Sequence, residues 1–389
     1  MPSPPVAERS APPRPKSPTA PPAAAEPKVG DLLWRYPLPI PGQNLSVGAV
    51  RNCPAVDEQG RVYLAIGNRL VALVPERDQA RVLWEYATGG TIPGSPAIGN
   101  DGNIRVHSRD GLLYCLTRAG EPAWTPAEVG QPLGWASPVV DPDGNTWVCD
   151  YHGGLLKVDP RGVRPRAPFF RSHQKFDSTP VIRDQRLYVG AEDGFVYCIA
   201  LDAARGRNTW DHLAGRGQTE WYINSSPALV GDVLYVAGRD EFLYAFDLDG
   251  RLLWRLRLRG QMLASPIVDA RGNVYVGLSL IRRGEKDLGK LVQVDGTTHR
   301  VRWECPGDGS VESTPVLGGD GVVYFGDNTG HVSAVDSDGR RLWRTDLKAP
   351  VRSAGTIAAP GRLLFGSDDG YLCCLCCSSE SRAAGGWPK

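Results

Sequence analysis

The sequence is poor in features that mark several classes of protein. It contains only 2 methionines. It also has no run of 18 apolar residues, the length that a transmembrane helix needs. The formal net charge is +1, so no excess of basic side chains favours binding to nucleic acid or to an anionic membrane. The first 28 residues hold many prolines and lack the apolar core of a secretory signal. We therefore expect a cytoplasmic protein, or a periplasmic or secreted one if an upstream segment is missing.

The motifs of common catalytic and metal sites are also incomplete. Residues 284–290 have phosphate-loop spacing, but Leu291 stands where Ser or Thr would bind magnesium, and a strand is expected next instead of a helix. Asp141 begins a segment that resembles a calcium loop, yet its twelfth position is His152 instead of Glu. The six histidines are scattered, and no catalytic triad signature appears. We predict no catalytic residues and no metal site.

Nine cysteines occur, and four of them crowd into residues 373–377. Overlapping Cys-x-x-Cys spacings would suit a metal or redox centre. In a strand, however, Cys373 and Cys377 face one side while Cys374 and Cys376 face the other, so four thiolates cannot converge on one zinc ion. Buried strand cysteines in a reducing compartment are the favoured interpretation, and redox and metal roles stay open as alternatives.

A repeat of a small residue and a proline runs through the chain and organises it. The pairs open short apolar segments every 39 to 49 residues: Cys53-Pro54, Ser95-Pro96, Ser137-Pro138, Thr179-Pro180, Ser226-Pro227, Ser265-Pro266 and Thr314-Pro315. Ala354-Gly355 holds the eighth place without the proline. A fixed period of this length indicates a repeat architecture.

Each repeat has the pattern of four short antiparallel strands. In the fourth repeat, residues 179–182, 186–190 and 195–201 are β-branched or aromatic and are separated by polar turns such as Asp193-Gly194. A fourth strand begins near Trp210, and a tryptophan recurs there in most repeats: Trp84, Trp124, Trp254, Trp303 and Trp343. The third repeat has Phe169 and Phe170 instead, so its edge should be the most irregular. Four-stranded units repeated radially form a β-propeller, and the tryptophans should dock one blade onto the next.

The last repeat lacks a fourth strand, and the first residues of the chain offer one. Leu32-Leu33-Trp34-Arg35 matches Leu252-Leu253-Trp254-Arg255, so the N-terminal strand should complete the eighth blade and place Trp34 beside Cys377. We predict an all-β fold: a single eight-bladed propeller over residues 30–378, closed by the N-terminal strand. A disordered proline-rich leader should cover residues 1–29 and a disordered tail residues 379–389.

The repeat also predicts where a binding site should lie. The first strand of each blade lines the channel of a propeller, so the residue three before each proline falls at one rim. These rim positions vary from blade to blade in charge and shape: Arg51, Pro93, Trp135, Asp177, Asn224, Leu263, Glu312 and Arg352. Loops on the same face add Arg171, His173, Trp221, Tyr222 and Arg239. Aromatic residues and arginine are typical of binding patches, although rim loops also vary simply because solvent tolerates change.

The repeating unit consists of Ser/Thr-Pro, a strand, the motif Tyr-Val-Gly-x-x-Asp-Gly-x-Val-Tyr, an Asp and finally a Trp. This unit resembles the pyrroloquinoline-quinone-like (PQQ-like) propeller repeat. Residues 178–210, 225–254 and 313–343 show the resemblance best, and it covers about residues 31–378. That repeat occurs in quinoprotein dehydrogenases, in the outer-membrane β-barrel assembly lipoprotein and in sensor propellers. The resemblance is specific for the fold and weak for function.

The dehydrogenases of this family are longer and hold their quinone in the channel, under a vicinal disulfide and beside a calcium ion held by carboxylate and amide groups. Here the vicinal cysteines fall in a third strand, and no matching calcium set can be assigned. The resemblance alone suggests pyrroloquinoline quinone, and the residues themselves point to no cofactor. The assembly lipoprotein needs a lipidated cysteine after a signal peptide, and this sequence starts without one.

These observations favour a non-catalytic monomer that binds a protein or peptide partner through the rim. The alternatives are a quinone-dependent dehydrogenase, or a degenerate relative that keeps the cofactor, and a carbohydrate- or polymer-binding propeller that uses Trp135, Trp221 and Tyr222.

Overall fold

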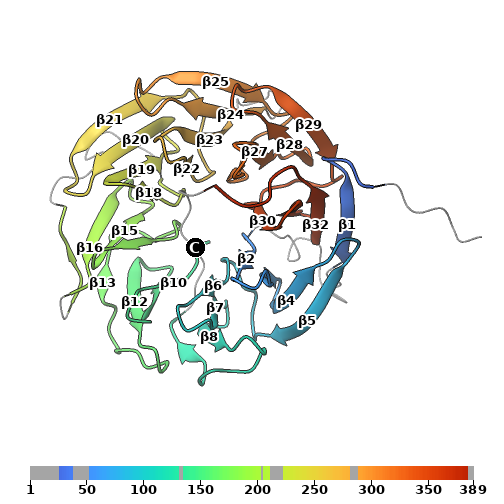
Figure 1. Cartoon of the computed structure of the whole chain (residues 1–389). Helices are drawn as coiled ribbons and strands as arrows, with labels where there is room; N and C mark the ends of the chain where they lie inside the picture. Colours follow the sequence, from blue (N-terminus) through green and yellow to red (C-terminus); the bar gives the residue numbers. More distant parts are fainter. Residues whose placement is uncertain are drawn as a thin grey trace, which may run out of the picture.

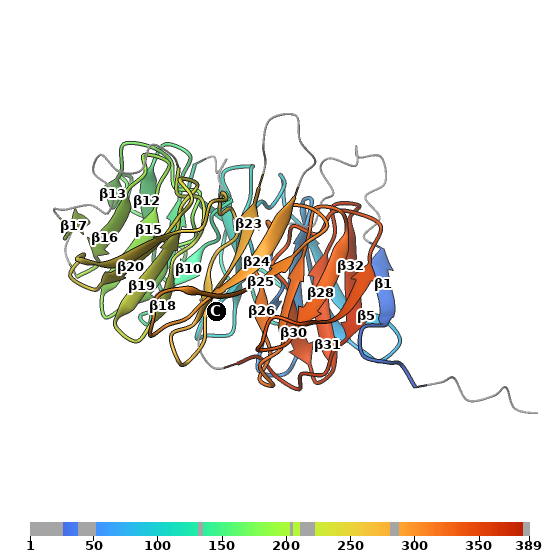
Figure 2. The same cartoon turned by 90° about the horizontal axis from the view of Figure 1, so that it is seen from above.

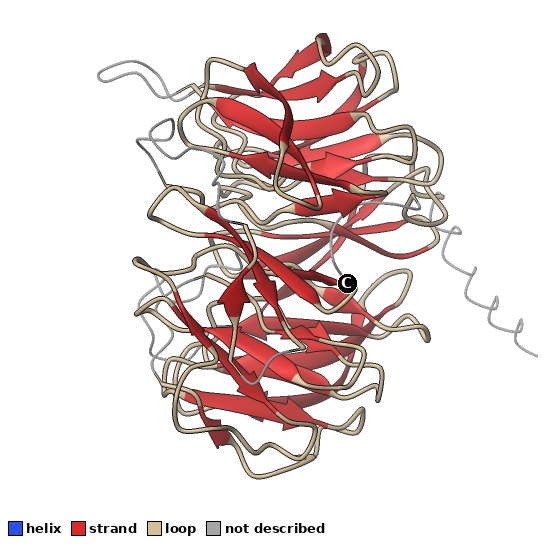
Figure 3. Ribbon diagram, turned by 90° about the vertical axis from the view of Figure 1, so that its left-hand side faces the viewer, coloured by secondary structure: helices blue, strands red, loops and turns tan. Residues whose placement is uncertain are grey.

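The computed structural model describes residues 26–37, 52–130, 135–202, 205–210, 222–280 and 288–383. Within these ranges the chain forms β-strands and no helix (Figure 3). Eight sheets of four antiparallel strands surround a central axis (Figure 1), and the view of Figure 2 shows the ring from its side. The protein is an all-β, eight-bladed propeller, as the repeat predicts.

The strands follow the repeat in order, with the innermost strand first in each blade. The first four blades are β2 (Ala55–Val56), β3 (Val62–Ile66), β4 (Arg69–Pro75), β5 (Ala80–Ala87); β6 (Ala97–Ile98), β7 (Ile104–His107), β8 (Leu112–Leu116), β9 (Ala127–Glu128); β10 (Val139–Val140), β11 (Thr146–Cys149), β12 (Gly154–Val158), β13 (Phe170–Arg171); and β14 (Val181–Arg183), β15 (Arg186–Gly190), β16 (Val196–Ala200), β17 (Arg207–Asn208). The last four are β18 (Ala228–Val230), β19 (Val233–Ala237), β20 (Phe242–Asp247), β21 (Leu252–Arg257); β22 (Ile267–Val268), β23 (Val274–Ser279), β24 (Gly289–Val294), β25 (Val301–Pro306); β26 (Val316–Leu317), β27 (Val323–Gly326), β28 (His331–Val335), β29 (Arg341–Asp346); and β30 (Thr356–Ala359), β31 (Arg362–Gly366), β32 (Tyr371–Cys376) with β1 (Leu32–Pro37).

The small residue before each proline links neighbouring blades near the axis. Its backbone N–H donates to the hydroxyl of the equivalent Ser or Thr in the next blade. Six such bonds of 2.8–3.1 Å form a series in which each residue donates to the next: Cys53 to Ser95, Ser95 to Ser137, Ser137 to Thr179, Thr179 to Ser226, Ser226 to Ser265, and Ser265 to Thr314. The hydroxyl therefore has a structural reason to recur, because each one satisfies a backbone donor of the preceding blade.

The series of hydroxyls stops at the eighth blade, where Ala354 offers no hydroxyl to Thr314. There Ser313 donates to the Ser353 carbonyl at 2.8 Å, which joins the seventh and eighth blades by another route. The proline is also excluded from this blade, because even a Cβ on Gly355 would lie 2.4 Å from the ring of Phe365.

The recurring tryptophans dock the blades at the periphery. The indole lies against a turn glycine of the next blade, so close that a Cβ on that glycine would come within 2.6–2.8 Å of the ring. The pairs are Trp84 with Gly120, Trp124 with Gly162, Trp210 with Gly250 and Trp303 with Gly339. The indole N–H of Trp84 also donates to the Arg118 carbonyl at 2.9 Å, and that of Trp303 to the Ser337 carbonyl at 3.0 Å. Trp254 instead stacks on His299 at 4.7 Å. The predicted docking role is therefore present in the contacts.

The N-terminal strand closes the ring. β1 pairs with β32, and Trp34 lies opposite Cys374, three residues from the predicted position beside Cys377. In most other blades a hairpin joins the third and fourth strands. In the eighth blade these strands are far apart in the chain, and the N–H of Gly30 donates to the Cys376 carbonyl at 2.8 Å. Trp34 then docks on the first blade, and its indole N–H donates to the Glu76 carbonyl at 3.1 Å. In Figure 1, β1 lies beside β32 although the two strands belong to opposite ends of the chain.

Two expectations about the outer strands are wrong: that the third blade has the most irregular edge, and that Trp124 and Trp210 lie within fourth strands. Irregular outer strands are shared by the second, third and fourth blades, whose β9, β13 and β17 have two residues each, so the third blade is not exceptional. Pro122 and Pro126 in the second blade, and Pro165 and Pro168 in the third, lack the N–H that a sheet ladder requires. Trp124 and Trp210 accordingly lie just outside their outer strands.

The segment expected as the start of a disordered tail makes ordered contacts over residues 379–383. Ser379 is buried, the Ser381 carbonyl accepts the N–H of Gly319 at 2.7 Å, and the Leu317 carbonyl accepts the N–H of Ala383 at 3.0 Å. The segment thus lies along the β26–β27 hairpin. Most of the expected leader (residues 1–25) and the last six residues fall outside the described ranges.

Because the described part of the chain contains no helix, it contains none long and apolar enough to cross a membrane.

Candidate binding face

One face of the ring carries both the hairpin tips between the second and third strands and the loops that lead into the first strands; we call it the rim face. Eleven of the predicted rim and loop positions lie on it: Pro93, Trp135, Arg171, His173, Asp177, Tyr222, Asn224, Arg239, Leu263, Glu312 and Arg352. Arg51 and Trp221 lie outside the described residues. These positions therefore share one face of the propeller, although Asp177 is buried there.

Asp177 and Asn224 belong to a polar cluster that joins the fourth and fifth blades. The ammonium of Lys175 lies 3.2 Å from Asp177 and 3.1 Å from Glu192, so one cation is shared by two carboxylates. The Asn224 amide donates to Asp177 at 3.1 Å and more weakly to Glu192 at 3.4 Å. Burial, and the neighbouring carboxyl group of Asp177, raise the pKa of Glu192 above its ordinary value. We call Lys175, Asp177, Glu192 and Asn224 the Lys175 cluster.

Glu312 and Arg352 belong to a second cluster of matching composition, between the seventh and eighth blades. The Arg352 guanidinium pairs with Glu312 at 3.3 Å and with Asp368, and it donates to the Asn328 amide oxygen at 3.0 Å. The Asn328 amide donates back to Glu312 at 2.8 Å. We call Glu312, Asn328, Arg352 and Asp368 the Arg352 cluster. The two clusters lie on different sides of the ring, near β14–β18 and near β26–β30 (Figure 1).

Sequence reasoning missed Lys175, Glu192, Asn328 and Asp368, which are four of the eight members of these clusters. The last three each stand two residues after the glycine that ends a second strand: Gly190, Gly326 and Gly366. That position varies between blades as the rim positions do. Applying the repeat register to the hairpin tips as well as to the prolines would have found it.

Exposed aromatic side chains gather on the rim face. Among the described residues, the exposed aromatics are Trp135 (49% exposed), Tyr151 (40%) and Tyr222 (47%), from loops of the second to the fifth blades. Lys175 lies over the ring of Tyr151, with its nitrogen 5.4 Å from the ring centre. Tyr222 precedes Asn224 by two residues, and its carbonyl accepts the N–H of Arg239 at 3.4 Å. Tyr151 therefore borders the Lys175 cluster, and Tyr222 lies two residues from Asn224 in the chain.

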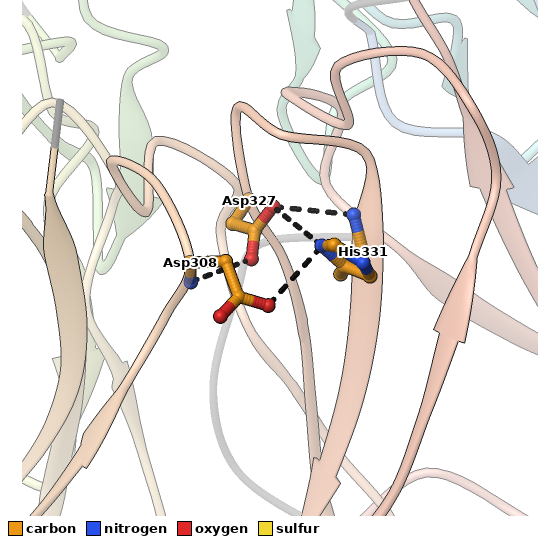
Figure 4. Close-up of side chains that lie close together, drawn as sticks. All are labelled: Asp308, Asp327 and His331. Carbon is orange, nitrogen blue, oxygen red and sulfur yellow. Dashed lines mark hydrogen bonds and ion pairs between the residues drawn. The ribbon is translucent and has the colours of Figure 1, made fainter. Parts of the chain in front are cut away.

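A third polar group contains Asp308, Asp327 and His331 (Figure 4), whose ligand atoms lie within 4.8 Å of one another. The side chain of Asp327 is already bonded inside the protein: one oxygen accepts the N–H groups of Thr329 at 2.9 Å and His331 at 3.1 Å, and the other accepts the N–H of Asp308 at 3.1 Å. Asp308 also pairs with Arg344. These bonds hold the β25–β26 loop against the β27–β28 hairpin, and they leave no free set of ligands, so we assign no ion here.

The cysteines do not fit a quinone site of the kind that the family resemblance suggests. Cys373 packs between the seventh and eighth blades and Cys374 between the eighth and first, so the two thiols point to opposite faces of their sheet. β32 is also the third strand from the axis. Burial raises the pKa of the Cys373 thiol to about 11, which keeps it protonated and unreactive. All nine cysteines are free.

The carboxylates near the axis do not fit such a site either. In both rim clusters the carboxylate and amide groups that could hold calcium surround a cation of the protein itself, Lys175 or Arg352. We therefore derive no reaction through a quinone.

Comparisons with known proteins place the chain in a family. The sequence profile described as outer membrane protein assembly factor BamB matches residues 23–167, 169–277 and 239–378. The protein of that name from Moranella endobia (strain PCIT) is 26% identical over 181 residues, which span 42% of this chain and 44% of the relative. The match thus covers less than half of that relative's length.

Solved structures agree on the fold. BamB from Moraxella catarrhalis superposes with a TM-score of 0.67 at 19% identity, over 90% of this chain and 100% of that chain. The quinohemoprotein alcohol dehydrogenase from Comamonas testosteroni gives a TM-score of 0.66 at 13% identity, over 91% of this chain and 77% of that chain. At these identities the similarity establishes the propeller and nothing finer. The family profile covers most of the chain, and the chain therefore belongs to the outer membrane protein assembly factor BamB family of PQQ-like propellers.

Proposed function

We propose that this protein is a non-catalytic scaffold that binds a protein or peptide partner through its rim face. The observation that supports the proposal most directly is the gathering of Trp135, Tyr151 and Tyr222 on that one face. Large aromatic side chains bury much area at a small entropic cost, and they are enriched with arginine at the centres of protein interfaces. Arg171 and Arg239 lie on the same face.

The name of the relatives supports a narrower proposal. They are called outer membrane protein assembly factors, so we propose that the partner belongs to such an assembly. This proposal favours a location with the outer membrane over the cytoplasm expected from the sequence. Fractionation of the native host separates the two, because a protein recovered with the cytosol would exclude an assembly partner at the outer membrane.

A photo-crosslinking amino acid tests the proposed face. It is placed at Trp135, Tyr151 or Tyr222, and at Leu253 as a matched control, since Leu253 is exposed to a similar extent (50%) on the outer strand β21. We expect a discrete crosslinked product, identified by mass spectrometry as the same protein, from the rim positions alone. Equal products from Leu253, or none from the rim positions in the native host, would contradict the proposal.

A further inference from the structure

The Lys175 cluster has unused acceptors. Asp177 is only 8% exposed; Lys175 and Asn224 bind one of its carboxylate oxygens, while the other has no hydrogen-bond partner among the described residues. The amide oxygen of Asn224 is likewise buried and unpartnered. An unsatisfied buried acceptor costs about 1–3 kcal/mol, so a folded protein that keeps two of them in one cluster gains when a donor arrives.

The cluster is also short of positive charge. Two carboxylates, Asp177 and Glu192, share the single ammonium of Lys175. The raised pKa of Glu192 has the same origin, because burial and the neighbouring Asp177 both disfavour its ionised form. A second cation would give each carboxylate a partner of its own.

The Arg352 cluster shows what a completed arrangement looks like. It has the same composition of one cation, two carboxylates and one asparagine, but the guanidinium of Arg352 reaches both carboxylates and the amide oxygen. None of its oxygens is among the buried unpartnered atoms of the described residues. Of the two clusters, only the Lys175 cluster therefore has buried unpartnered oxygens, and these do not follow from its composition.

Lys175 has other contacts that could hold it if it moved away from Asp177. Lys175 pairs with Asp177, and its ammonium also lies above the ring of Tyr151 and beside Glu192. A small rotation of this flexible side chain would release Asp177 while keeping the contacts with Tyr151 and Glu192.

We propose that the Lys175 cluster receives a basic side chain, lysine or arginine, from the protein partner. Its N–H groups donate to the unused oxygens of Asp177 and Asn224, and its alkyl stem lies against the exposed rings of Tyr151 and Tyr222. Lys175 moves off Asp177 and remains paired with Glu192. The inference rests on the proposed rim-face function, for which it names the chemistry of the contact.

Two short peptides test the inference on the full chain: acetyl-Tyr-Lys-Tyr-amide and its glutamine counterpart, acetyl-Tyr-Gln-Tyr-amide. Calorimetric titration should show the lysine peptide binding about ten-fold more tightly, as expected for a hydrogen bond to a charged group. Asp177→Asn should abolish the difference. Glu312→Gln, the matched change in the Arg352 cluster, should preserve it. Equal affinities, or no binding of the lysine peptide at about 10 mM, would overturn the inference.

Lys175→Met separates recognition from a merely structural role, because it removes the competing ammonium. Binding of the lysine peptide should become tighter, whereas a cluster that only braces the blades would bind it no better. Glu192→Gln provides a second reading if Asp177→Asn fails to fold, and it should weaken the lysine peptide selectively.

The result is separable from that of the crosslinking experiment. Loss of peptide selectivity in the Asp177→Asn variant with no native rim crosslink would leave the site standing and remove the proposed function. Native rim crosslinks that Asp177→Asn leaves unchanged, together with equal affinities for the two peptides, would support the rim-face function and overturn the proposed site in the Lys175 cluster.

Discussion

Gly339 accepts the face of the Trp303 indole where no larger residue fits. A Cβ at this position would lie 2.7 Å from the ring, and the backbone has a φ of +84°. Gly339→Ala should therefore be destabilising through both strain and the clash. Gly321→Ala is the matched control, since Gly321 has a φ of +82° and nothing lies within 4 Å of an added Cβ. Both changes incur about 1–2 kcal/mol of backbone strain.

We expect chemical denaturation to show Gly339→Ala less stable than Gly321→Ala by a further 1–3 kcal/mol or so, the usual cost of overpacking. Equal losses would mean that the indole contact between blades contributes little.

The buried side chain of His107 makes the free energy of unfolding depend on pH. Burial lowers its pKa to about 4 from the ordinary value near 6.5, although a hydrogen bond with the Gly130 backbone and the charge of Asp110 oppose the shift. On acidification the unfolded chain binds the proton first. The stabilisation is thus complete above pH 6.5 and is lost as the pH falls toward 4, by about 3 kcal/mol in all.

Denaturation at several pH values between 7 and 4 measures this effect. His107→Asn should flatten the loss of stability over that interval, whereas His152→Asn, at an exposed position, serves as the control. An unchanged acid profile in His107→Asn would show that other groups dominate.

At the scale of the element, the small residue before most of the prolines joins its blade to the preceding one through a hydroxyl. The Ser226 hydroxyl accepts the buried N–H of Thr179 at 2.9 Å. Ser226→Ala should leave that donor unsatisfied and lower the free energy of unfolding by about 1–3 kcal/mol. Ser337→Ala removes an exposed hydroxyl and should have little effect. Thermal unfolding compares the two, and an equal shift would remove the proposed role of the hydroxyl series.

The repeat predicted the elements well because it is local. Turn residues, alternating apolar positions and one tryptophan per unit specify four strands without long-range information. The register of β1 on β32 was harder, since a β-bulge between Leu32 and Trp34 shifts the pairing. The recurring tryptophan does not predict the short outer strands of the second and fourth blades, because it docks on the next blade without a regular strand around it.

The rim clusters could be predicted only in part, because they form between blades. Sequence register placed Asp177 and Asn224 at equivalent positions of adjacent blades. It did not show that Lys175 and Glu192 meet them, since these lie at other offsets in the repeat. The contrast between the Lys175 and Arg352 clusters depends on how far each cation reaches, which only the side-chain geometry reveals.

At the scale of the whole molecule, ring closure depends on a strand from the far end of the chain. β1 covers the edge of β32 and carries Trp34, which docks on the first blade. Arg35 and Gly30 also bond to the seventh blade, through the Leu347 carbonyl and through the Thr345 hydroxyl. Without β1 the eighth blade would expose an apolar strand edge, and the contact between the eighth and first blades would lose its tryptophan.

Two deletions test this closure. Removing residues 1–25 should leave the melting temperature unchanged, because the turn that begins the closing strand starts at Lys28, whose N–H donates to Asp31 at 2.7 Å. Removing residues 1–37 should lower the melting temperature and promote aggregation, since an unpaired strand edge recruits other chains. A synthetic peptide of residues 26–37 should restore monomeric protein when added to the truncated chain, because it supplies both the edge strand and Trp34. A truncated protein that stays as stable and soluble as the full chain would show that the ring does not need its closing strand.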